Sequence, residues 1–69
     1  MDILHKLGRQ IQKYRKSRGL TQEMLAERTG LHRTYIGAIE RGERNLTIEN
    51  LNKIATALDT PLFELFRFE

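Results

Sequence analysis

Apolar residues recur every three or four positions along most of the chain, which is the spacing of one face of an α-helix. The first predicted helix covers about residues 2–18, with an apolar face of Ile3, Leu4, Leu7, Ile11 and Tyr14. Its opposite face is basic and carries Lys6, Arg9, Lys13 and Lys16. No segment alternates between apolar and polar residues, so the pattern predicts an all-α protein without a sheet.

Four further helices are predicted, over about residues 22–29, 33–41, 48–58 and 61–67. Thr21 and Thr47 stand where N-caps are expected, and Gly30 permits a very short turn between the second and third helices. Pro61 suits the first position of the last helix. We therefore predict a single domain over residues 1–69, a compact five-helix bundle whose helices over about 48–67 close the core.

The segment from about residue 22 to 41 has the features of two helices that cross steeply around a glycine turn. Ala26 is small enough for the crossing, and Ile36 and Ile39 would anchor the second helix inward. The remaining face of that helix is polar or small and consists of Arg33, Thr34, Gly37, Ala38 and Arg41.

A helix anchored on one side and open on the other can enter the ~12 Å wide major groove of B-DNA. Arg33 lies at its start, where base-contacting side chains are found, and could pair with guanine for ~1–3 kcal/mol of discrimination. Thr34 could offer a hydroxyl to a base edge or a methyl group to thymine, while Gly37 and Ala38 would let the backbone approach. These four residues are the predicted base contacts, and we expect His32 to cap or edge the helix.

Three stretches, LTQEMLAERTGL, TYIGAIERG and LTIENLNKIATALDTPLFEL, resemble the lambda-repressor-like helix-turn-helix of the phage Cro/repressor family. Within that family, RTYIGAIERGERNLT is similar to controller proteins of restriction–modification systems, whose pattern has serine where this chain has Gly37. The resemblance covers Leu7 to Phe66. It implies a transcriptional activator or repressor that binds a palindromic operator in double-stranded DNA as a homodimer.

The resemblance also implies roles for particular residues. Gln22 would contact a phosphate, and Tyr35, Arg44 and Asn45 would contact the sugar-phosphate backbone beside the groove. Arg15 and Glu40 would form a partly buried ion pair between the first and third helices. Arg41 could reach a phosphate or stabilise the C-terminal end of its helix through its charge.

The charge distribution supports a polyanionic partner. The net charge is +3, and residues 1–44 hold ten Lys/Arg against five Asp/Glu, whereas residues 45–69 hold two against four. The chain has no cysteine, two histidines and no catalytic or ligand-spaced constellation, so we expect no enzyme activity, metal, cofactor or small-molecule ligand. Without an apolar run of ~20 residues, no membrane span is expected. We expect a cytoplasmic protein that associates with the bacterial nucleoid when bound to DNA.

The C-terminal aromatic residues raise two alternatives. Phe66 suits the core, but Phe63, Phe66 and Phe68 together could form a homodimer surface. Phe63 and Phe68 could instead fold back on their own chain. An alternative function is a protein-interaction module on the same fold, such as an antitoxin or an adaptor.

Overall fold

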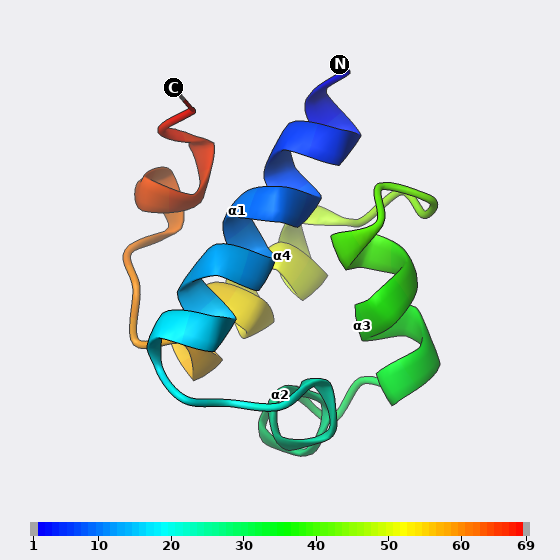
Figure 1. Ribbon diagram of the computed structural model, residues 1–69, viewed down its shortest axis with the longest axis vertical. Coiled ribbons are helices and arrows are strands. Elements are labelled where there is room, and N and C mark those ends of the chain that lie inside the picture. Colours follow the sequence, from blue (N-terminus) through cyan, green and yellow to red (C-terminus); the bar gives the residue numbers. More distant parts are fainter. Residues whose placement is uncertain (1, 69) are drawn as a thin grey trace.

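A computed structural model of the chain describes residues 2–68, which form four α-helices and a closing 3₁₀ helix and contain no strand. The elements are α1 (Ile3–Ser17), α2 (Gln22–Thr29), α3 (Arg33–Glu40), α4 (Ile48–Ala57) and η1 (Leu62–Phe66). In Figure 1, α4 lies behind α1, α2 is seen end-on below them, and α3 stands at one edge. The predicted all-α fold is confirmed, and the α-helices begin and end within about two residues of their expected bounds.

The helix starts are fixed by side-chain caps. The side chain of Asp2 accepts the amide hydrogen of His5, that of Thr21 accepts from Met24, and that of Thr47 accepts from Asn50, at donor–acceptor distances of 3.0, 3.1 and 3.0 Å. Each cap satisfies one of the amide groups that the first turn of a helix leaves without a partner. The left-handed backbone of Gly30, with φ of 74°, ends α2 and turns the chain toward α3.

The last element corrects the prediction of a fifth α-helix. It is a 3₁₀ helix of five residues, and Pro61 precedes it with a ψ of 141° instead of occupying its first helical position. No side chain caps its start. A segment this short gains too few α-helical hydrogen bonds to offset the cost of nucleation, so its contacts with the rest of the fold decide its geometry.

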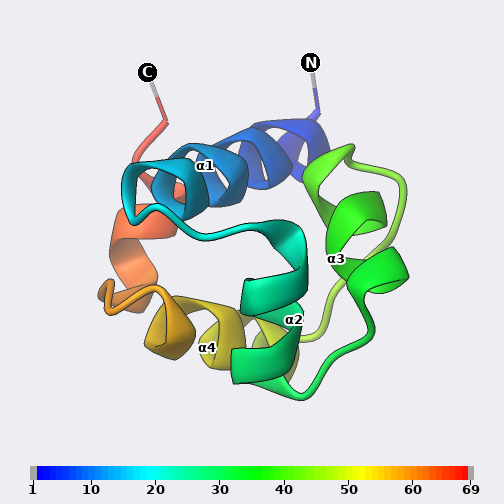
Figure 2. The same cartoon turned by 60° about the horizontal axis from the view of Figure 1, so that its bottom comes forward.

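Polar side chains of α1 hold this closing segment. Gln10 Nε2 donates to the carbonyl oxygens of Glu64 and Arg67 at 3.2 and 2.9 Å, and the Tyr14 hydroxyl donates to the Glu64 carboxylate at 3.0 Å. Just after α1, Arg18 donates to the carbonyl oxygen of Leu58 at the end of α4 at 2.8 Å. The chain therefore closes on its own first helix, as Figure 2 also shows.

All five elements contribute to one hydrophobic core. Its largest fully buried side chains are Ile11, Leu25, Ile36, Ile39, Ile54, Leu58 and Leu65. Each such side chain stabilises the fold by ~1.5–3 kcal/mol before the entropy cost of ordering the chain is subtracted.

Gly8 allows α1 to approach α3 very closely. A Cβ atom built on Gly8 would lie 2.3 Å from the carbonyl oxygen of Ile39 and 2.7 Å from that of Glu40. Both oxygens belong to the backbone at the end of α3, so neither can rotate away. A residue without a side chain is therefore needed where the two helices touch.

Candidate nucleic-acid interface

Helix α3 is anchored as the sequence predicts. Ile36 and Ile39 are buried, and a ring nitrogen of His32 accepts the amide hydrogen of Thr34 at 3.1 Å, which confirms His32 as the cap. Figures 1 and 2 place α3 at the edge of the fold, with no other element beyond its outer side. One side of the helix is thus fixed and the other remains available.

The outer side of α3 forms a shallow hollow of about 260 Å³ together with the start of α2. Its lining residues are Gln22, Arg33, Thr34, Gly37 and Arg41. Four of the five residues predicted on this face therefore lie together, and Gln22, predicted as a phosphate contact, joins them from α2.

Ala38 does not line this hollow, and its role as a base contact stays a prediction. Its exposed fraction is only 8%, because α3 packs against both α1 and α2 and only a narrow stripe of its surface stays open. Gly37 is also buried, but it lines the hollow beneath the side-chain ends of Arg41 and Gln22. An eight-residue helix between two neighbours exposes less of its surface than a helix with one neighbour.

Both arginines of the hollow are paired with acidic side chains that the sequence analysis did not single out. Arg33 Nη1 lies 3.4 Å from Glu23 Oε1, and Arg41 Nε lies 3.1 Å from Glu43 Oε2. All four side chains are more than half exposed, so each pair contributes only ~0–1 kcal/mol and is easily exchanged for another anion. The proximity of Glu43 in the sequence could have indicated its pair, whereas nothing local points to Glu23.

A second group of predicted contacts meets at the turn after α3. The Arg44 guanidinium lies 5.2 Å from the ring centre of Tyr35, and the Tyr35 hydroxyl donates to the carbonyl oxygen of Asn45 at 3.4 Å. Asn50, in the first turn of α4, donates to the same hydroxyl at 3.3 Å. The structure thus brings Tyr35, Arg44 and Asn45 together and adds Asn50, which the sequence analysis missed.

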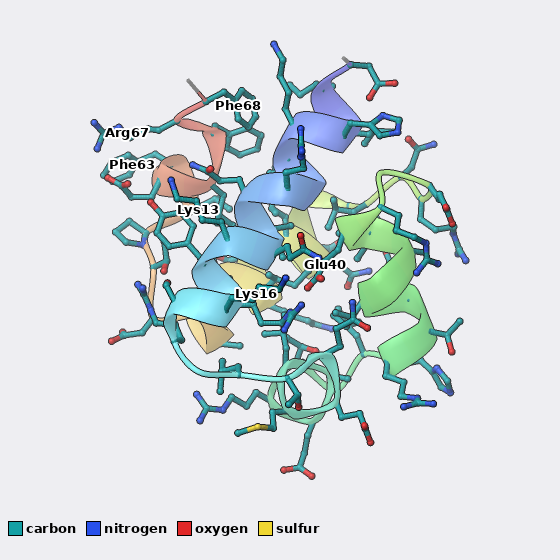
Figure 3. All side chains as sticks on the ribbon, in the orientation of Figure 1. Lys13, Lys16, Glu40, Phe63, Arg67 and Phe68 are labelled. Atoms are coloured by element: carbon teal, nitrogen blue, oxygen red, sulfur yellow. The ribbon has the colours of Figure 1, made fainter. Side chains whose placement is uncertain are left out.

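The expected ion pair joins α1 to the end of α3. Arg15 donates from Nε and Nη2 to the two carboxylate oxygens of Glu40 at 2.7 and 3.0 Å, and these side chains are 9% and 1% exposed. Gln22 Nε2 donates to Glu40 at 3.0 Å. Glu40 lies between α3 and α1 in Figure 3. The pair therefore sets the position of α3 and also holds Gln22 at the rim of the hollow.

The C-terminal aromatic residues divide between surface and core. Phe63 and Phe66 are 65% and 38% exposed. Phe68 is half-buried against the hydrophobic core, and its ring meets that of Phe66 edge-on at 6.3 Å between centres. Phe68 thus follows the alternative of folding back on its own chain, while Phe63 and Phe66 are exposed. Figure 3 shows Phe63 and Phe68 on the closing segment beside α1.

Residues 2–68 contain neither a metal-binding cluster nor a membrane-spanning helix. No three histidine, cysteine or acidic residues in this range are grouped so that they could hold a metal ion. No helix in the same range is long and apolar enough to cross a membrane.

A model of the helix-turn-helix family matches residues 11–65, the segment that contains α2, α3 and the hollow. The chain belongs to the helix-turn-helix family. This helix-turn-helix protein is 49% identical over 65 residues to control protein C.SmaI of Serratia marcescens, which covers 94% of this chain and 77% of that protein.

Solved structures agree with this assignment. The restriction-modification controller protein C.AhdI from Aeromonas hydrophila matches the helix-turn-helix protein with a TM-score of 0.90 and 48% identity, covering 91% of this chain and 96% of that one. SinR, a master regulator for biofilm formation solved in complex with DNA, matches with a TM-score of 0.83 and 34% identity, covering 87% and 97%. The predicted resemblance to controller proteins is confirmed.

Proposed function

We propose that the chain is a sequence-specific DNA-binding transcriptional regulator that controls a restriction–modification system. The observation that carries this proposal is the open hollow on α3, where Arg33 and Thr34 stand exposed on a helix whose other side is held in the core. Relatives named as control proteins support the biological role.

In this function, α3 enters the major groove. Arg33 leaves its weak pair with Glu23 and donates two hydrogen bonds to a guanine, and Thr34 meets the neighbouring base. Two groups contact the backbones on either side of the groove. Gln22 and Arg41 form one group at the hollow, and the other is the cluster of Tyr35, Arg44 and Asn45, which joins the first turn of α3 to the loop after it.

A homodimer supplies the specificity that one short helix lacks. Phe63 and Phe66 are large, exposed and adjacent in the closing segment, so they suit a surface that a second copy covers. Two-fold symmetry would place the two α3 helices ~34–36 Å apart, one turn of DNA. With DNA as the partner, we place the protein in the bacterial cytoplasm, on the nucleoid when bound.

Selection of bound sequences from a random DNA pool tests this proposal. We expect enrichment of a short inverted repeat whose half-sites are one helical turn apart. Arg33→Ala should relax the base preference at one position of each half-site, whereas Arg44→Ala should weaken binding to all sequences and reduce the salt dependence by about one phosphate contact. Arg28→Ala, on the exposed surface of α2, is the matched control and should change neither.

Three results would count against the proposal. The first is a pool that enriches no sequence, and the second is an Arg33→Ala variant with an unchanged base preference. The third is a chain that ignores DNA and binds another protein, which would favour the interaction module. Sedimentation of a Phe63→Asp variant tests the dimer separately, because this change should shift the protein toward the monomer at a given concentration.

A further inference from the structure

The hollow on α3 has a floor without a side chain. Gly37 lies between Gln22, Arg33, Thr34 and Arg41, and its backbone amide belongs to the helical hydrogen-bond pattern of α3. The floor therefore offers a CH₂ group and no free hydrogen-bond donor, whereas the walls carry guanidinium, amide and hydroxyl groups.

The fold does not need this position to be glycine. A Cβ atom on Gly37 would lie 3.2 Å from Arg41 Nη1 and 3.5 Å from Gln22 Oε1, and both atoms are at the ends of side chains. This differs from Gly8, where the nearest atoms are backbone oxygens of α3. The space above Gly37 is thus covered by the side-chain ends of Arg41 and Gln22, and it opens to an incoming group when the Arg41 guanidinium turns away, as it would toward a phosphate.

A polar base atom that faces the CH₂ of Gly37 finds no hydrogen-bond partner on the floor itself and depends on the side chains of the walls for one. A methyl group would lose nothing. In the major groove, the apolar group that a base pair presents is the C5-methyl of thymine. The C5-methyl of 5-methylcytosine projects from the same ring position.

We propose that the hollow over Gly37 is a binding site for the C5-methyl group of a pyrimidine in the operator. The inference rests on the proposed function and names the base feature that this part of α3 recognises. When Arg33 and Arg41 exchange their acidic partners, Glu23 and Glu43, for DNA, the space over Gly37 becomes free between them. The methyl group enters between them and packs against the CH₂ of Gly37.

The test uses the operator obtained by selection and replaces its thymines with deoxyuridine, one position at a time. Deoxyuridine keeps the hydrogen-bonding edge of thymine and lacks only the methyl group. For the native protein, we expect one position in each half-site at which the replacement weakens binding about fourfold, the change given by burial of one CH₂-sized group. With cytosine at that position, 5-methylcytosine should bind more tightly than cytosine by a similar factor.

Gly37→Ala fills the hollow and should abolish the difference between thymine and deoxyuridine at that position. The variant should fold well, because alanine favours a helix and displaces only flexible side-chain ends; a thermal melt checks this. Thr34→Ser is the matched control, since it removes a methyl group from the wall and leaves the floor open. It should keep the preference for thymine.

The outcomes separate the methyl site from the proposed function. Specific binding to the unmodified operator with no effect of deoxyuridine at any position would overturn the methyl site alone. An equal loss of affinity at every thymine would show that deoxyuridine changes the duplex as a whole. A thymine preference that survives in Gly37→Ala but not in Thr34→Ser would assign the contact to Thr34. Either result overturns the inference. If no sequence is selected, the proposed function and the methyl site fail together.

Discussion

Replacing Gly8 with alanine should force α1 away from α3. The new Cβ would lie 2.3 Å from the carbonyl oxygen of Ile39, and Cβ contacts below 3.0 Å are essentially never observed, so the two helices must separate by at least 0.7 Å at this point. The same movement would stretch the hydrogen bonds between Arg15 and Glu40, which join the same two helices.

The expected loss of stability follows from two opposing effects. Overpacking a buried contact costs ~1–3 kcal/mol, and a clash with backbone atoms belongs at the upper end of that range. Alanine regains up to ~1 kcal/mol over glycine in the middle of a helix. The net loss is about 2 kcal/mol, a large part of the ~3–10 kcal/mol that holds a domain of 69 residues together.

Thermal unfolding followed by circular dichroism at one protein concentration measures this effect. We expect the midpoint of Gly8→Ala to fall by about 8–16 °C. Gly37→Ala makes the same substitution in α3, where only flexible side-chain ends are near, and should raise the midpoint by a few degrees. If both variants were equally or more stable than the native protein, the proposed contact between α1 and the backbone of α3 would be refuted.

Three further changes test other contacts. Arg15→Leu should lower the free energy of unfolding, measured with urea, by about 3–5 kcal/mol, because it leaves the Glu40 carboxylate buried without its partner. Adding Glu40→Leu should recover most of this loss, and no recovery would contradict the reasoning. The Arg67 guanidinium lowers the pKa of Glu64, so the ionised Glu64 stabilises the fold at neutral pH, and this contribution disappears as the pH falls through the lowered pKa. In an NMR titration, Arg67→Ala should raise the pKa of Glu64 toward its ordinary value. An unchanged pKa would exclude Arg67 as the cause of the shift. Thr47→Ala should cost ~1 kcal/mol in the same urea assay through loss of the α4 cap, whereas native stability would show that the cap contributes nothing.

Features encoded by a few neighbouring residues could be predicted from the sequence. Thr21, His32 and Thr47 cap helices because their side chains reach an amide two or three residues away, which is a local property. Gly30 ends α2 for a similarly local reason, since its positive φ favours a residue without a Cβ atom. The helical pattern and these caps together are sufficient to predict that one face of α3 stays open.

Features that depend on neighbours distant in the sequence were missed or misassigned. Ala38 was assigned to the open face because periodicity does not show that α3 packs against two other helices. The pairing of Arg33 with Glu23 arises only when α2 and α3 cross. Gly8 did carry a signal, because a glycine inside an amphipathic helix usually has a packing reason, and that signal predicts a close contact without naming its partner.

The hydrogen bonds between α1 and the closing segment join residues 50 to 57 positions apart in the chain. During synthesis, α1 leaves the ribosome long before the residues that complete its surroundings, including the fully buried Leu65. Until they emerge, the apolar side of α1 stays uncovered and the loop between the two segments cannot close. The native core therefore cannot be completed until the closing segment is present, and a chain that lacks this segment exposes apolar surface of α1 that favours aggregation.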